Sequence, residues 1–206
     1  MGKWPMPARR LILASTSPYR RELLSRLRLR FDVRSPEVDE TPAPGERAPV
    51  LTRRLALAKA DAVAGGDIDA VVIGSDQVAE LDGRTIGKPG DHAGATAQLR
   101  AMRGRTVVFH TAVAVVCRAA GFREVGLASV SVRFRDLNDV EIENYLRAEQ
   151  PYDCAGSAKA ETLGIALLDG IESDDPTALI GLPLIRTCAL LRRAGIDPLG
   201  AAEGAQ

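Results

Sequence analysis

Short apolar runs alternate with amphipathic segments along most of the chain. Runs of strand-like length and apolar content lie at 11–15, 31–36, 70–76 and 164–172. Segments with helical character lie at 18–27, 50–64, 91–103, 139–149 and 182–195. This alternation predicts an α/β protein.

Two further patterns add antiparallel strands to this picture. The β-rich runs 106–118 and 125–135 are separated by a short Ala-Ala-Gly segment, which predicts an antiparallel pair. Turn signals within 80–90 predict a hairpin. We therefore expect a mixed, twisted sheet with flanking helices, built from one domain of two lobes over residues 11–195. Residues 1–10 are expected to form an N-terminal extension and 196–206 a C-terminal tail.

Composition narrows the classes of function. The 206 residues are 46% hydrophobic, and 27 basic residues balance 27 acidic ones, so no net charge draws the chain to nucleic acid or to a membrane surface. No run of about 18 apolar residues predicts a membrane span. The three cysteines, Cys117, Cys154 and Cys188, form no zinc-type spacing with His92 and His110. Reduced thiols in a cytoplasmic protein are the expectation.

The first candidate site follows the apolar run 11–14. Ser15 and the two residues after it offer hydroxyls and backbone N–H groups just before a predicted helix, an arrangement that favours anions. Arg20 and Arg21 add forked donors suited to phosphate, although the first turn of a helix disfavours cations. Alternatively, Ser17 caps the helix and the two arginines are solvated.

A second candidate site follows the apolar run 70–74. Asp76 could activate water or hold a divalent cation, Gln77 could orient either, and Lys88, fixed next to a proline, could neutralise phosphate. The alternative is a carboxylate that caps a turn and a lysine on the surface. Glu40, in the acidic stretch "SPEVDE", could complete a magnesium–polyphosphate site. Lys59 lies among small apolar residues, from which it could reach the surface or a cleft.

Several other chemistries lack their motifs. The chain contains neither GxxxxGK[ST] nor GxGxxG, and its two histidines are not arranged for a Ser-His-Asp set. Hydrolysis by a metal-activated water therefore fits these residues better than covalent catalysis does.

Six motifs in order give the chain a specific resemblance over residues 11–193. These are "LILASTSPYRRELL", "PEVDE", "RLALAKA", "VIGSDQV", "GKP" and "YDCAGSAKAETLGI", and together they resemble the Maf family of nucleoside triphosphate pyrophosphatases. The resemblance implies a fold like that of inosine triphosphate pyrophosphatases, with two lobes, a central cleft and often a homodimer. It also implies hydrolysis between the α- and β-phosphates of a nucleotide with a divalent metal, Mg²⁺ or Mn²⁺.

The same resemblance assigns roles to individual residues. Asp76 matches the proton acceptor that activates water, and Glu40 matches an acidic residue that would share the metal with Asp76. The positions that match phosphate-binding residues are Ser15, Arg20, Arg21, Lys59 and Lys88.

Three residues are similar to those of one branch of the family. Tyr19, Gln77 and Glu161 resemble the branch that prefers 7-methyl-GTP, whose methylated, cationic guanine suits an aromatic face and a carboxylate. The chain departs from that branch at Ala158, where an aromatic residue is common, and at Thr162, where glycine is usual. The alternatives are a dTTP/UTP pyrophosphatase of the same family and a nucleotide-binding regulator of cell division that does not need turnover.

Overall fold

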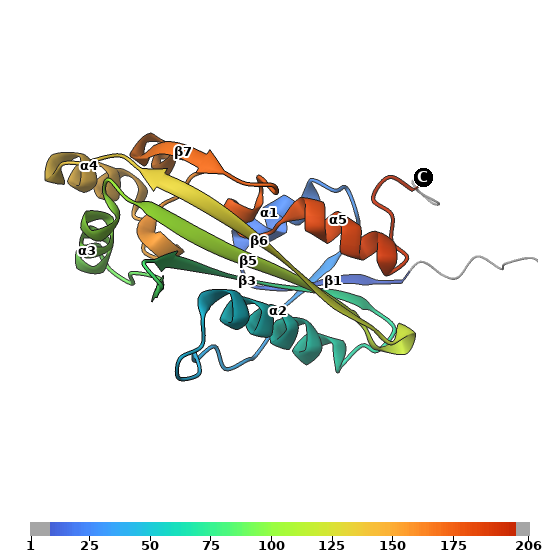
Figure 1. Cartoon of the computed structure of the whole chain (residues 1–206). Helices are drawn as coiled ribbons and strands as arrows, with labels where there is room; N and C mark the ends of the chain where they lie inside the picture. The colour runs from blue at the N-terminus through green and yellow to red at the C-terminus, as the bar shows by residue number, and fades with distance from the viewer. Residues whose placement is uncertain (1–8, 201–206) are drawn as a thin grey trace, which may run out of the picture.

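The computed structural model describes residues 9–200, and within that range one seven-stranded sheet forms the centre of the protein (Figure 1). The predicted N-terminal extension 1–10 lies mostly outside the described residues, and the predicted tail 196–206 lies partly outside them. The strands are β1 (Leu11–Ala14), β2 (Asp32–Arg34), β3 (Val71–Leu81), β4 (Arg84–Ile86), β5 (Thr106–Cys117), β6 (Phe122–Phe134) and β7 (Leu168–Glu172). The α-helices are α1 (Pro18–Ser25), α2 (Ala48–Ala64), α3 (His92–Met102), α4 (Asp139–Glu149) and α5 (Leu184–Arg193).

The sheet combines parallel and antiparallel pairing, which confirms the predicted mixed α/β architecture. Its order is β2–β1–β3–β5–β6–β7, and β4 pairs with β3. β1 is parallel to both β2 and β3, whereas β3, β5, β6 and β7 are successively antiparallel. The β1–β3 register ends at Ala14 opposite Gly74, but β3 stays paired with β5 as far as Glu80.

The two faces of the sheet bury different helices because side chains alternate along each strand. Ile12 and Val72 point to the face that α2 covers. Leu13 and Ile73 point to the opposite face, where α1 and α5 pack. In Figure 1, α2 lies on one side of the sheet and α1 and α5 lie on the other. The apolar residues of β1 and β3 are therefore buried on both faces.

A separate core fills the other end of the sheet. There α3 and α4 pack against the far halves of β5 and β6, around the buried side chains of Phe109, Phe134 and Leu146. β5 and β6 run through both ends of the molecule (Figure 1). The division of residues 11–195 into two lobes within one domain stays a prediction.

The predicted hairpin is confirmed at β3 and β4. Asp82 and Gly83 have φ values of 50° and 75°, the left-handed pair that a tight two-residue turn between antiparallel strands requires. The helices expected at 91–103 and 139–149 are also confirmed, and each begins at a side-chain cap, Asp91 and Asn138. No helix among residues 9–200 has the length and apolar content needed to cross a bilayer.

Two strand predictions were wrong in their limits. β3 does not end at Asp76 but continues to Leu81, because β5 supplies an antiparallel partner beyond the end of β1. The predicted strand 164–172 is a strand only from Leu168, and residues 163–167 form a 3₁₀ turn. Gly164 permits that turn, since an added Cβ would lie 2.4 Å from the carbonyl oxygen of Lys159.

The contact between β3 and α2 is the tightest constraint at a glycine of this sheet. A Cβ on Gly74 would lie 2.2 Å from the carbonyl oxygen of Ala56 and 2.6 Å from the amide nitrogen of Ala60. We expect Gly74→Ala to lower the free energy of unfolding by about 3 kcal/mol, because α2 must move away from the sheet. Urea denaturation measures this loss. Gly87→Ala, where a Cβ meets no atom within 4 Å, is the matched control and should show no comparable loss.

Candidate active site

A cleft of about 610 Å³ opens where β1 ends and β3 continues. The chain leaves β1 through residues 15–17 and enters α1, so the hydroxyls of this loop lie beside the stretch of β3 that β1 no longer pairs with. The cleft brings together every predicted site residue but one, from six separate parts of the chain. Those residues are Ser15, Tyr19, Arg20, Glu40, Lys59, Asp76, Gln77, Lys88 and Glu161.

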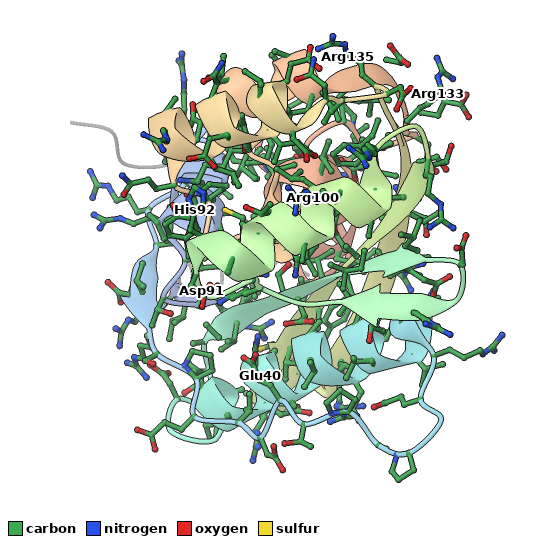
Figure 2. All side chains as sticks on the ribbon, turned by 90° about the vertical axis from the view of Figure 1, so that its left-hand side faces the viewer. Glu40, Asp91, His92, Arg100, Arg133 and Arg135 are labelled. Carbon is green, nitrogen blue, oxygen red and sulfur yellow. The ribbon has the colours of Figure 1, made fainter. Side chains whose placement is uncertain are left out.

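A buried lysine joins the two predicted metal ligands. The Nζ atom of Lys59 lies 2.7 Å from Oδ1 of Asp76 and 2.7 Å from Oε1 of Glu40. Asp76 and Lys59 are each only 8% exposed at the side chain, while Glu40 is 59% exposed. Figure 2 shows Glu40 beside α2, the helix that carries Lys59. Of the two options for Lys59, the structure therefore selects the cleft rather than the surface.

The two carboxylates of this cluster have opposite pKa shifts. Burial raises the pKa of Asp76, although the charges of Lys59 and Arg20 oppose the shift. Burial also acts to raise the pKa of Glu40, but the hydrogen bond and charge of Lys59 outweigh it and the pKa is lowered. A buried carboxylate with a raised pKa is suited to accept a proton.

The loop after β1 organises its own hydroxyls and the first arginine. Ser17 caps α1, because its Oγ accepts a hydrogen bond of 3.4 Å from the backbone N–H of Arg20. Oγ of Ser15 accepts from the backbone N–H of Ser17 at 3.1 Å. The guanidinium of Arg20 donates to the Gly181 carbonyl at 2.9 Å and to the Ser15 hydroxyl at 3.4 Å. Arg20 is thus fixed toward the cleft, near the carboxylates of Asp76 and Glu40.

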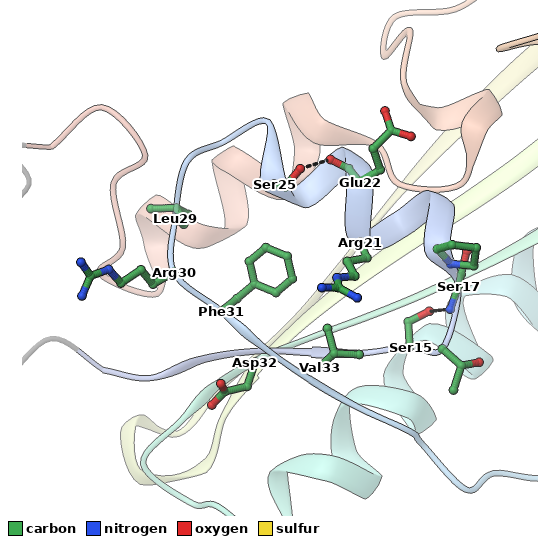
Figure 3. Close-up of a pocket in the computed structure, with 12 residues that line it drawn as sticks. Ser15, Ser17, Arg21, Glu22, Ser25, Leu29, Arg30, Phe31, Asp32 and Val33 are labelled. Carbon is green, nitrogen blue, oxygen red and sulfur yellow. Dashed lines mark hydrogen bonds between the residues drawn. The ribbon is translucent and has the colours of Figure 1, made fainter.

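Arg21 is the predicted site residue that does not line this cleft. It is exposed and lines a neighbouring hollow of about 950 Å³, on the other side of residues 15–18. Figure 3 shows Arg21 beside Phe31 and Val33. Successive residues of an α-helix point about 100° apart, so adjacent arginines cannot share one direction. A role for Arg21 in phosphate binding stays a prediction.

Gln77 faces the opposite side of β3 from Asp76 and holds a segment that the sequence did not indicate. Its Nε2 donates to the carbonyls of Ala178 and Leu179, at 2.9 and 3.0 Å. The neighbouring Gly181 carbonyl accepts from Ser75 as well as from Arg20. The 178–181 segment therefore forms part of the cleft wall. No local signal marks it, because its contacts arise only when the chain returns to β3.

Two of the remaining predicted residues, Tyr19 and Glu161, belong to a second group in the cleft, while Lys88 lies near Glu40. The Tyr19 hydroxyl lies 3.9 Å from Sγ of Cys154, and burial, together with Cys154, Asp153 and Glu161, raises the tyrosine pKa. Burial raises the pKa of Cys154 to about 12, so this thiol stays protonated. Burial also raises the pKa of Glu161, against the charge of Lys159. Asp153, which sequence reasoning missed, lines the same part of the cleft.

The donor set fits a metal that the substrate helps to bind. Glu40 and Asp76 both contact the Lys59 ammonium and so lie close together, but no cluster of three or more His, Cys, Asp or Glu side chains within residues 9–200 could hold an ion alone. Mg²⁺ is commonly held by one or two carboxylates, with water and substrate phosphates completing the shell. These two residues are suited to that kind of site.

Comparison with known proteins identifies the relatives of this chain. The family described as Maf-like protein matches residues 10–194. A 7-methyl-GTP pyrophosphatase of Polaromonas sp. (strain JS666) is 67% identical over 92% of this chain and 86% of that protein. Proteins with the same name from Albidiferax ferrireducens and Cupriavidus metallidurans are 64% and 56% identical, over 94% and 93% of this chain and 97% and 96% of their own.

The buried lysine cluster leads to a pH-dependent stability prediction. We expect Lys59→Met to lower the free energy of unfolding by about 3 kcal/mol near neutral pH, because Asp76 keeps a buried charge without its partner. Without Lys59 the pKa of Asp76 rises further in the folded state. Stability then falls as pH increases from the ordinary aspartate pKa to the raised one, so the deficit should shrink in acid.

Urea denaturation at about pH 7 and about pH 4.5 measures both parts of this prediction. Lys88→Met is the matched control, since Lys88 lines the same cleft but is exposed. It should change stability by no more than about 0.5 kcal/mol at either pH. An equal deficit for Lys59→Met at both pH values would contradict the buried ion pair.

Proposed function

Because the chain belongs to the Maf family, we propose that it is a nucleoside triphosphate pyrophosphatase that converts 7-methyl-GTP to 7-methyl-GMP and pyrophosphate. The observation that carries the proposal is the cleft in which the buried Asp76 carboxylate lies among Arg20, Lys59 and Lys88. The names of the relatives, all 7-methyl-GTP pyrophosphatases, supply the substrate. Removal of modified nucleotides by a homodimer belongs to the same proposal and rests on the family resemblance, and a cytoplasmic location rests on the cysteine pattern.

The charges of the cleft divide it into a part for phosphates and a part for the base. Glu40 is within electrostatic reach of Lys59, Lys88 and Arg20. Tyr19 is within reach of Asp153 and Glu161. Since Tyr19 and Arg20 are neighbours on α1, the two parts meet at this helix. A nucleotide, with an anionic tail and a base at its two ends, suits such a division.

In the proposed reaction, water attacks the α-phosphorus and the bond from that phosphorus to the bridging oxygen breaks. Asp76 accepts the proton of the attacking water, and pyrophosphate leaves with the bridging oxygen. Arg20 and Lys88 stabilise the negative charge that develops on the leaving group. Lys59 holds the Asp76 carboxylate in place at 2.7 Å. Glu40 and Asp76 would hold a divalent cation, Mg²⁺ or Mn²⁺, which supplies neutralisation of phosphate charge when bound.

Recognition of the base depends on the second part of the cleft. Methylation at N7 leaves guanine with a positive charge, which the face of Tyr19 attracts. The carboxylate of Glu161 can accept hydrogen bonds from the N1–H and N2–H groups of guanine. Asp153 adds a second negative charge near Tyr19. Together these groups favour a cationic guanine over a neutral pyrimidine.

The decisive assay is pyrophosphate release from a panel of canonical and methylated nucleoside triphosphates with Mg²⁺, Mn²⁺ or no metal. We expect the highest kcat/KM for 7-methyl-GTP. Asp76→Asn should reduce kcat by about 10² or more, because the general base is lost while the shape of the side chain is kept. The circular dichroism spectrum and melting temperature of the variant establish that it is folded.

Other outcomes of the same assay assign the alternatives. Highest activity on dTTP and UTP would retain the chemistry and reject Tyr19, Gln77 and Glu161 as residues that select methylguanine. Thermal stabilisation by nucleotide without pyrophosphate release would identify a nucleotide-binding regulator. Wild-type turnover in Asp76→Asn would reject the role of Asp76 as the general base that accepts the proton of water.

Glu161 gives a separate prediction about specificity. Glu161→Ala should lower the ratio of kcat/KM for 7-methyl-GTP to that for UTP by about tenfold, because the purine loses a charged hydrogen-bond acceptor. Steady-state kinetics with both nucleotides measures the ratio. Glu172→Ala removes an exposed carboxylate of β7 that does not line the cleft, and it should leave the ratio unchanged. A ratio unaffected by Glu161→Ala would contradict the assigned role.

A further inference from the structure

Gln98 of α3 connects the phosphate part and the base part of the cleft from outside the cleft lining. Gln98 accepts a hydrogen bond at its Oε1 from the hydroxyl of Ser157, at 2.6 Å. Its Nε2 donates to the carbonyl oxygen of Gly87, at 3.0 Å. Ser157 belongs to the segment that lines the base part of the cleft, and Gly87 immediately precedes Lys88. Gln98 itself does not line the cleft.

The segment 151–158, called the base-side segment below, depends on the hydrogen bond between Ser157 and Gln98. Ser157 is 0% exposed and has a φ of 53°, a left-handed conformation that is costly for a residue with a side chain. Its predecessor Gly156 has a φ of 71° and lies against Phe109, where a Cβ would come within 3.0 Å of the ring. The backbone of this segment is therefore tightly specified. Without Gln98, the buried hydroxyl of Ser157 would lose the acceptor that it now uses.

The turn at residues 87–90, which carries Lys88 and is called the phosphate-side turn below, makes few contacts besides the hydrogen bond from Gln98. Gly87 and Lys88 are exposed, and a Cβ on Gly87 would meet no atom within 4 Å. The packing of Ile86 against the core therefore holds the turn before Gly87, and side-chain packing at Gly87 itself does not. Two hydrogen bonds fasten it. One comes from Gln98, and the other joins the Gly90 amide to the Tyr152 carbonyl at 3.1 Å. The position of Lys88 is thus set by backbone contacts to α3 and to the base-side segment.

His92, a second residue of α3, also contacts the segment 151–158. His92 makes a 3.0 Å hydrogen bond with the Tyr152 hydroxyl and a 2.9 Å contact with Glu143 of α4. Figure 2 shows His92 at the beginning of α3 and Arg100 further along the helix. α3 therefore holds the 151–158 segment near its first residue and again at Gln98. Its buried face, with Leu99 and Met102, anchors the helix in the core.

We propose that Gln98 is a positioning residue that sets the place of Lys88 relative to the bound base. The inference rests on the proposed function, since it concerns the distance between the base and phosphates of one nucleotide. Only a side chain that accepts and donates at once can satisfy both Ser157 and Gly87. Glutamate would place a carboxylate against the Gly87 carbonyl, and methionine would keep the length without either bond. A small misplacement of a charged group that contacts the reacting phosphates is costly to turnover.

The test is a double-mutant cycle between Gln98 and Lys88, with kcat/KM for 7-methyl-GTP as the readout. Gln98→Met should lower kcat/KM by about tenfold, mainly through kcat, because the lysine is displaced from the leaving group. In a Lys88→Ala background the same substitution should cost less than about twofold, since no lysine is left to misplace. An equal loss in both backgrounds would overturn the proposal, as would unchanged kinetics for Gln98→Met.

Arg100→Gln provides the matched control on the same helix. The Arg100 guanidinium binds Asp139 of α4 at 2.9 and 3.1 Å, away from the cleft. Its loss should leave kcat/KM within about twofold of wild type, as expected for an exposed ion pair. A tenfold loss for Arg100→Gln as well would mean that α3 responds to any substitution, and would overturn a specific role for Gln98.

Hydrogen exchange separates this inference from the proposed function because it needs no turnover. In Gln98→Met the Gly90 amide, which donates to the Tyr152 carbonyl, should exchange at least about fivefold faster than in wild type, while the amides of α2 keep their protection. Unchanged exchange of the Gly90 amide would overturn the positioning role even in an active enzyme. Faster exchange in a protein that releases no pyrophosphate would support the positioning role and reject the proposed activity.

Discussion

The candidate site depends on a change of strand partners along β3. β1 pairs with β3 only as far as Gly74, whereas β5 remains paired with β3 to Glu80. Between Gly74 and the start of the β4 pairing at Ala79, one edge of β3 therefore has no neighbouring strand, while the other edge stays paired with β5. Asp76 and Gln77 lie in this stretch. Asp76, the candidate proton acceptor, is therefore carried by a strand that is hydrogen-bonded to β5 on its other side. The loop from β1 to α1 comes to the same place because β1 ends there.

Side chains alternate along β3, so Asp76 lies on one face of the strand and Ser75 and Gln77 lie on the other. Asp76 points toward α2, where Lys59 is available to compensate its buried charge. Ser75 and Gln77 point the other way, where they bind the carbonyls of residues 178–181. One strand thus positions the buried Asp76 carboxylate on one face and a wall of the cleft on the other. The absence of a side chain at Gly74 brings α2 close enough for the lysine to reach.

The parts of the site that could be predicted from the sequence are those that depend on neighbouring residues in the chain. Parts that depend on distant residues could not be predicted. Polar residues directly after apolar runs indicated Ser15, Asp76 and their neighbours, and the structure brings these into one cleft. The extent of β3 was missed because "SDQ" has the polarity of a strand end, and the partner that continues it lies some 30 residues later in the chain. Arg20 and Arg21 are indistinguishable in the sequence, but the helical rotation between them sends Arg21 to another surface.

Gln98 marks the limit of that kind of prediction. It lies in an amphipathic helix, and nothing in its spacing distinguishes it from a solvated polar residue. Its role emerges only because the chain brings Gly87 and Ser157, which are 70 residues apart, to the same side chain. Tyr19 and Arg20 join the two parts of the cleft within α1, whereas Lys88 and the segment around Ser157 are distant in sequence and need a contact that connects them. Gln98 makes that connection with one side chain, since its amide group donates to the Gly87 carbonyl and accepts from the Ser157 hydroxyl at the same time.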